Sequence, residues 1–245
     1  MTLVEVCLDD LAGVGVAERA GADRIELCAA LGDGGITPSI GTVAAALRRA
    51  TRIGVNVLIR QRAGDFVYTP DEIDAMADDI RAIRALPRAA GVELAFVIGA
   101  LTPAGTVDAD AVATLVAACG DAQATFHKAF DQVPDRAAAL EELVHLGIRR
   151  VLTSGGAATA AEGADQLADL VAQADGRIVI LAGGGVRPGN VADLVARTGV
   201  AEVHLRAAEE VAGAGFPGPY DSGTRTVASA SVVAQLLAAL GRSAA

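Results

Sequence analysis

Two short stretches near the amino terminus repeat one chemical pattern: an apolar residue, Glu, an apolar residue and Cys. They read "VEVC" and "IELC" and contain Glu5, Cys7, Glu26 and Cys28. If each stretch is a β-strand, alternate side chains share a face, so each Glu lies on the same face as its Cys. Thiolates bind soft ions such as Cu(I), and carboxylates serve as general acids or bases. The pattern therefore predicts a metal site or an acid–base site, with inert core packing as the alternative.

Further titratable side chains follow the same alternation later in the chain. The stretch "TFHKAFD" contains His127, Lys128 and Asp131, a combination that can transfer protons. The side chains expected to face one shared interior are Glu5, Cys7, Glu26, Cys28, Asn56, Arg60, His127, Glu202 and His204. We expect the carboxylates, Arg60 and the histidines to neutralise one another there, because unpaired buried charge is costly. The predicted catalytic residues are Glu5, Glu26, Arg60, His127 and Asp131. The alternative is a buried ion network that only stabilises the fold.

Glycine-rich segments supply a second candidate, an anion-binding site. The stretches "TSGG" and "AGGGVRPGN" each follow a predicted strand, and glycine lets backbone N–H groups approach an anion closely. The charged loop 60–66, "RQRAGDF", is a candidate lid. The predicted substrate- or anion-binding residues are Arg62, Lys128, Ser154, Gly155, Gly156, Gly183, Gly184, Gly185, Arg187 and His204. The alternatives are plain tight turns and a solvated loop.

These residues need elements that bring them together, and the chain contains eight β-like runs, most of them separated by stretches of helical period. The runs span residues 3–7, 24–28, 54–60, 92–98, 124–128, 149–153, 177–181 and 201–205. Strands that alternate with helices form parallel βαβ units. Eight units predict a (β/α)8 TIM barrel over about residues 3–206, with its site at the carboxyl ends of the strands. An open doubly wound sheet is the alternative, but no GxGxxG follows the first run.

Local signals mark the ends of the intervening helices. The glycines expected in the left-handed conformation just past a helix end are Gly21, Gly91, Gly147 and Gly199. The stretch "TPDE", which begins at Thr69, predicts a helix start with a capping box. The Gly- and Pro-rich segment after residue 207 predicts a loop, and residues 229–240 predict a closing helix. We expect residues 1–245 to form a single domain.

Composition excludes several classes of partner. The formal charge is −10 and the sequence pI is about 4.7, which argues against nucleic acid and anionic membranes as partners. Three distant cysteines form neither a disulfide framework nor a CxxC zinc pattern. We expect Cys119 to pack at a helix end. Apolar runs are far shorter than a membrane span, and no organic cofactor is implied. These features predict a cytoplasmic protein.

At a series of motifs the chain resembles the CutC copper homeostasis family, in the family's order over about residues 3–206. The motifs are "EVCLDD", "AGADRIELCAAL", "GGITPS", "VLIRQRAGDF", "GALTPAGTVD", "TFHKAFD", "RVLTSGG" and "GRIVILAGGGVRPGNV". The resemblance implies a (β/α)8 barrel and a cytosolic Cu(I)-binding protein, with Cys7 and Cys28 as copper ligands. It also implies a homodimer or larger oligomer.

Two functional hypotheses follow. The first is a CutC-like copper homeostasis protein that binds Cu(I) through cysteines at the barrel mouth. The second is a barrel enzyme of lyase, isomerase or hydrolase type that acts on a small anionic or sugar-like substrate. The chain departs from the family's usual sequence at Gln61, Ala63 and Lys128. It also departs in "HLRAA" after the eighth run, which weakens the expectation of an anion site between the seventh and eighth strands.

Overall fold

Eight parallel strands close into a barrel in this computed structural model, which describes residues 1–215, 218 and 222–242. Each strand pairs with its neighbours in the chain, and β8 returns to pair with β1. The strands are β1 Leu3–Leu8, β2 Arg24–Leu27, β3 Gly54–Leu58, β4 Leu94–Ile98, β5 Ala124–Phe126, β6 Arg150–Thr153, β7 Val179–Gly183 and β8 Glu202–Leu205. The predicted (β/α)8 fold is therefore confirmed, and each predicted strand overlaps an observed one.

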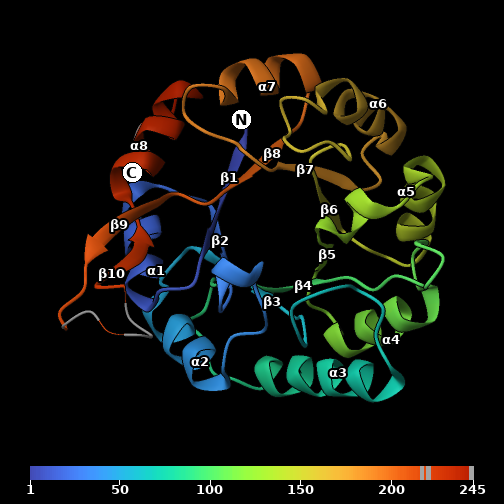
Figure 1. Ribbon diagram of the computed structural model, residues 1–245, viewed down its shortest axis with the longest axis horizontal. Helices are drawn as coiled ribbons and strands as arrows, with labels where there is room; N and C mark the ends of the chain where they lie inside the picture. Colours follow the sequence, from blue (N-terminus) through green and yellow to red (C-terminus); the bar gives the residue numbers. More distant parts are fainter. Residues whose placement is uncertain (216–217, 219–221, 243–245) are drawn as a thin grey trace.

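Helices surround the barrel (Figure 1). They are α1 Leu11–Ala20, α2 Ile40–Arg49, α3 Pro70–Arg84, α4 Ala109–Cys119, α5 Arg136–His145, α6 Ala164–Ala174, α7 Val191–Thr198 and α8 Ala230–Ala239. Short 3₁₀ helices span Leu31–Asp33 and Lys128–Gln132. Among the described residues, none of the helices combines the length and the apolar character needed to cross a membrane.

The helix ends follow the sequence signals with one exception. Thr69 accepts a hydrogen bond from the backbone N–H of Glu72, and the Glu72 carboxylate accepts one from the N–H of Thr69, which completes the predicted capping box. Gly21 and Gly199 adopt the left-handed conformation directly after α1 and α7. Gly91 also has a positive φ, but α3 ends at Arg84, so this glycine shapes the loop before β4 rather than the helix end.

The main apolar cluster lies between the barrel strands and the helices. Strand residues such as Val4, Val6 and Ile25 pack there with helix residues such as Val14 and Leu47. The alternate side chains of the strands fill the barrel interior. A second, smaller apolar cluster in the interior is formed by Cys7, Cys28, Leu58 and Val97, with Leu31 packed against it. The barrel interior thus combines polar and sulfur-containing side chains with a few apolar ones.

The segment after residue 207 differs from the predicted loop. Strands β9 (Ala208–Ala212) and β10 (Thr224–Ala228) pair in antiparallel fashion, because the Thr and Val residues of β10 suit a strand while the Gly- and Pro-rich stretch falls between the two strands. The predicted closing helix is confirmed as α8. Arg242 donates to the Asp23 carboxylate at 2.6 Å and fastens this end of the chain to the start of β2. The tail prediction also covers residues 216–217, 219–221 and 243–245, which lie outside the described residues.

Candidate functional site

A cavity of about 170 Å³ opens at the carboxyl ends of the barrel strands. Its wall includes Cys7, Cys28, Leu58, His127, Leu152 and His204. A larger hollow of about 420 Å³ lies at the amino ends, against Arg24 and Arg150. Those arginines are already bound to Glu202. The cavity that holds unpaired donors, thiols and histidines is therefore the better candidate for a site, as is usual for this fold.

The two thiols of this cavity are in contact. Cys7 comes from β1 and Cys28 directly follows β2, which pairs with β1, and their Sγ atoms are 3.8 Å apart. The hydrogen bond with Cys28 lowers the pKa of Cys7 to about 5, although burial opposes this change. The same bond, together with burial, raises the pKa of Cys28 well above 9.0. The pair therefore holds one proton at neutral pH, on Cys28, and presents Cys7 as a thiolate.

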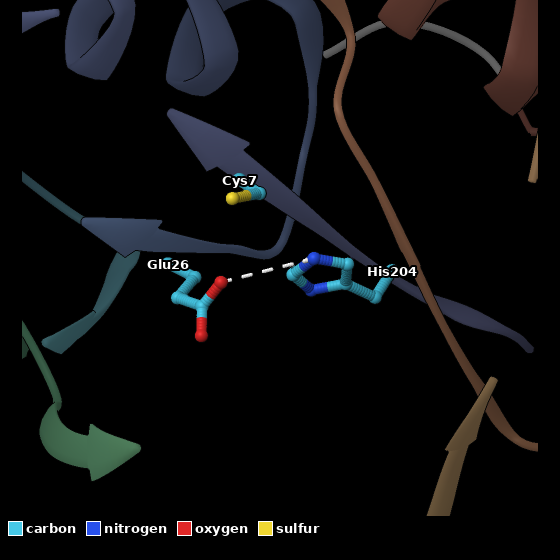
Figure 2. A group of neighbouring side chains, drawn as sticks. All are labelled: Cys7, Glu26 and His204. Atoms are coloured by element: carbon cyan, nitrogen blue, oxygen red, sulfur yellow. Dashed lines mark ion pairs between the residues drawn. The ribbon is translucent and has the colours of Figure 1, made fainter. Parts of the chain in front are cut away.

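Glu26 and His204 complete a compact group with Cys7. Their ligand atoms all lie within 4.8 Å of one another (Figure 2). Burial and the adjacent Cys7 thiolate raise the pKa of Glu26 well above 4.5. Burial would lower the pKa of His204, but its bonds to Cys7 and Glu5 and the charge of Glu26 raise it well above 6.5. Thiolate, imidazole and carboxyl groups thus converge on one point.

Glu5 orients the His204 ring from behind. Nδ1 of His204 donates to the Glu5 carboxylate at 2.8 Å, which leaves Nε2 facing Glu26 at 3.8 Å. A carboxylate that holds one ring nitrogen of a histidine while the other ring nitrogen meets a metal is a common arrangement in metal sites. Burial would raise the pKa of Glu5, but the His204 bond and the Arg24 charge lower it to about 2.

A buried ion network supports Glu5 from the amino end of the barrel. Arg24 binds Glu5 at 2.6 Å and Glu202 at 2.5 Å, and Arg150 binds Glu202 at 2.7 Å. Asn56 donates to Glu5 at 2.8 Å. Every charge in this layer is paired, as buried charges require. The network fixes the position and ionisation of Glu5, and through it the orientation of His204.

The donor set suits a soft ion. Metal–thiolate bonds are about 2.3 Å long, so sulfurs 3.8 Å apart can share one ion in a bent arrangement. Thiolates select Cu(I) among the common ions, and imidazole is also accepted by copper. Burial and the adjacent Cys7 thiolate raise the pKa of Glu26, which weakens it as a ligand for a hard cation. The Cys7 and Cys28 thiols therefore fit Cu(I), and His204 is a nitrogen donor that lies beside Cys7 rather than beside Cys28.

Comparison with known proteins places the chain in a family. The family model described as "CutC family" matches residues 2–209. The chain belongs to the CutC family. It is 49% identical over 204 residues to a CutC family protein of Caulobacter vibrioides, covering 82% of this chain and 80% of that one. It is 44% identical over 205 residues to the human protein named copper homeostasis protein cutC homolog, covering 84% and 73%.

Solved structures agree with this assignment. A CutC crystal structure from Streptococcus agalactiae is 34% identical, with a TM-score of 0.76, covering 83% of this chain and 98% of that one. A phosphoribosyl anthranilate isomerase from Thermococcus kodakaraensis is 16% identical, with a TM-score of 0.59, covering 98% of this chain and 99% of that one. That second likeness shows only a shared barrel fold.

Two predicted residues, Arg60 and His127, line the same cavity, and Arg60 makes contacts that differ from the expected ones. Arg60 donates to the backbone carbonyls of Gly34, Gly35 and Gly64, rather than to the carboxylates that we expected beside it. The reason is that β3 ends at Leu58, so Arg60 belongs to the loop layer above the carboxylates. His127 immediately follows β5.

Lys128 reaches the cavity, whereas Asp131 anchors a loop. Asp131 accepts hydrogen bonds from Lys128 at 2.6 Å, from the hydroxyl groups of Ser154 and Thr153, and from the N–H of Gly156. Its carboxylate is therefore fully engaged, and its predicted catalytic role stays a prediction. The N–H of Gly155 donates to Thr153, so this amide too is used inside the loop.

The remaining predicted anion-binding residues, apart from His204, are not among those that line the cavity. Gly183 is the β7 partner of His204, and a Cβ at Gly184 would contact Ser154 and Lys128. Gly185 accepts a hydrogen bond from the Asn190 side chain through its carbonyl. Two arginines point elsewhere: Arg62 pairs with Glu72 and Asp65, and the exposed Arg187 donates to the carbonyl of Val186. The structure therefore does not gather the full predicted set.

Sequence reasoning missed Arg24 and Arg150 as partners of the interior carboxylates. The signal was present, because Arg24 has the same parity as Glu26 and Cys28, and Arg150 has the parity of Leu152. Both arginines are the first residues of their strands, a position from which a long side chain could equally well reach solvent.

Proposed function

We propose that this protein binds Cu(I) as cargo through Cys7 and Cys28, with His204 as a third donor, in the service of copper homeostasis. The observation that carries the proposal is the contact between two buried thiols, 3.8 Å apart, in the cavity at the carboxyl ends of the strands. Membership of the CutC family supports it, since the human relative is named a copper homeostasis protein. We also expect a homodimer or larger oligomer.

Proton release accompanies binding in this proposal. Cys7 is already a thiolate at neutral pH, whereas Cys28 and His204 must each lose a proton before they bind the ion. Affinity for Cu(I) therefore rises with pH. Glu5 acts on affinity indirectly, because it orients the His204 ring, and loss of such a partner commonly costs 10- to 100-fold in metal affinity.

The test is anaerobic competition of the reduced protein against a chromogenic Cu(I) chelator. We expect one tightly bound Cu(I) per chain, and its loss in the Cys7→Ala, Cys28→Ala double variant. Cys119→Ala is the matched control, because Cys119 is a buried thiol of the main core that lies outside the cavity. Unchanged Cu(I) binding in the double variant would refute the proposal, as would equal loss in the Cys119 variant.

His204 is tested separately. His204→Ala should retain binding with lower affinity and a weaker dependence on pH, because one of the two displaced protons is gone. X-ray absorption at the copper edge should show two sulfur neighbours and one nitrogen in the wild-type protein, and two sulfurs alone in the variant. A spectrum identical in both proteins would remove His204 from the ligand set but leave the thiols.

A further inference from the structure

Two buried hydrogen-bond donors in the cavity wall have no acceptor in the part of the chain that the structure describes. The His127 side chain is 5% exposed, and its Nδ1 accepts a hydrogen bond from the N–H of Ala129 at 3.2 Å. The ring proton therefore sits on Nε2, which is buried and has no partner among the described residues. Burial, followed by the charge of Arg60, lowers the pKa of His127 to about 3, so the ring is a neutral donor. An unmatched buried donor is costly.

Arg60 adds a buried positive charge to the same wall. It is 6% exposed, and its Nη atoms bind the backbone carbonyls of Gly34, Gly35 and Gly64, while its charge also acts on the Tyr68 hydroxyl. Its Nε is buried without an acceptor, and no carboxylate of the described residues pairs with it. The Phe66 ring contacts both donors, with its centroid 4.9 Å from the Arg60 Cζ and 4.8 Å from the His127 ring centroid. A buried cation without a counter-ion indicates that an anion belongs beside it.

The rest of the cavity narrows the class of anion. Lys128 also lines the cavity with its charge paired to Asp131 at 2.6 Å, while Leu31, Leu58 and Leu152 make part of the wall apolar. An engineered cavity of about 150 Å³ holds a benzene-sized molecule, so about 170 Å³ accommodates roughly six to eight non-hydrogen atoms. A fully polar anion such as phosphate leaves the leucines facing oxygen. A carboxylate with a short apolar tail can accept hydrogen bonds from Arg60 and His127 and place its apolar part against the leucines.

We propose that this cavity binds a small monocarboxylate, whose oxygens accept hydrogen bonds from Arg60 Nε and His127 Nε2 and whose apolar tail contacts the leucines. Charge and donor geometry on this wall exclude a cation there, so the carboxylate and the Cu(I) ion occupy different walls of one cavity. The inference goes beyond copper binding and does not depend on it, because neither Arg60 nor His127 is a proposed copper ligand.

The test uses the reduced, metal-free protein and three probes: butyrate, its neutral counterpart butyramide, and inorganic phosphate. We expect butyrate to bind saturably with one site per chain and to move the His127 Nε2–H resonance in an NMR titration. Butyramide should bind at least about 10-fold more weakly, because a hydrogen bond to a charged acceptor is stronger than one to a neutral acceptor. Phosphate should bind more weakly than butyrate.

Two variants and a control locate the site. Arg60→Met should lose butyrate binding, and Arg48→Met, which changes an exposed arginine of α2, should bind as the wild type does. Arg60 also binds three loop carbonyls, so His127→Phe provides a second variant that keeps an aromatic ring against Phe66 while it removes the Nε2 donor, together with the Nδ1 acceptor of the Ala129 N–H. It should weaken butyrate binding by about 10-fold.

The proposal is overturned by any of four results. They are no saturable butyrate binding, equal binding of butyrate and butyramide, tighter binding of phosphate than of butyrate, and unchanged butyrate binding in His127→Phe. Failure of Cu(I) binding in the wild-type protein would leave these measurements unaffected, since they are made without metal.

Discussion

The loss of folding stability at acid pH should depend on Glu5, and its size follows from the contacts that lower the pKa of this carboxylate. Its carboxylate is buried and bound by Arg24, Asn56 and His204, and its pKa falls from 4.5 to about 2. A group whose pKa is depressed in the folded state contributes stability that is complete above its unfolded pKa and is lost as pH falls toward the folded pKa. Each pKa unit is worth about 1.4 kcal/mol. The full contribution of Glu5 near neutral pH is therefore about 3 kcal/mol.

The assay is urea unfolding of the wild type and Glu5→Gln at about pH 5.5 and about pH 3, where His204 is protonated in both folded and unfolded states. With a folded pKa of about 2, linkage removes about 2 kcal/mol of the Glu5 contribution between these pH values. The wild type should lose that much more stability on acidification than Glu5→Gln.

Parallel pH dependences for the two proteins, within about 0.5 kcal/mol, would refute the reasoning, because Glu5 would then be no more acidic in the folded state than in the unfolded state. Asp165→Asn is the control, since Asp165 is an exposed carboxylate that pairs only weakly with Arg197 at 3.4 Å. Its pH dependence should match that of the wild type.

Two further predictions concern the cavity. Mild oxidation with diamide should form a disulfide between Cys7 and Cys28, because their Sγ atoms already lie 3.8 Å apart. The intact mass should drop by two hydrogens and Cu(I) binding should vanish. Reduction should restore the original mass and Cu(I) binding. A disulfide that involves Cys119 would contradict this pairing. Gly99→Ala should displace the His127 ring, which an added Cβ would contact, at a cost of about 1–3 kcal/mol in urea unfolding. Butyrate affinity should fall as well, and a variant with wild-type stability and affinity would show that the ring has room to move.

The barrel was predictable because its units repeat one local pattern. Eight apolar runs, helical stretches between them and glycines such as Gly21 and Gly199 all indicate the same fold. The β9–β10 pair was not foreseen, because its Gly- and Pro-rich connection dominated the composition of the segment. Short strands with exposed residues such as Glu209 and Glu210 carry too little apolar periodicity to be recognised.

Strand parity also predicted much of the candidate site. Glu5, Cys7 and His204 meet in the interior because each lies on the inward face of β1 or β8, and these two strands are paired. Strand parity does not predict the position of a side chain along the barrel axis. Arg60 has the inward parity, yet it lies above the carboxylates, whereas Arg24 lies beside Glu5 in the paired register. Such pairings depend on strand register, which a single sequence does not display.

The separation of the two apolar clusters has an evolutionary consequence. The cluster between strands and helices provides most of the buried apolar surface, whereas Cys7 and Cys28 belong to the small interior cluster. Substitutions at the thiols therefore leave the packing between strands and helices intact. A lineage can lose or exchange its metal donors and still inherit a folded barrel. Conservation of the fold among relatives is accordingly a poor guide to whether a given relative handles copper.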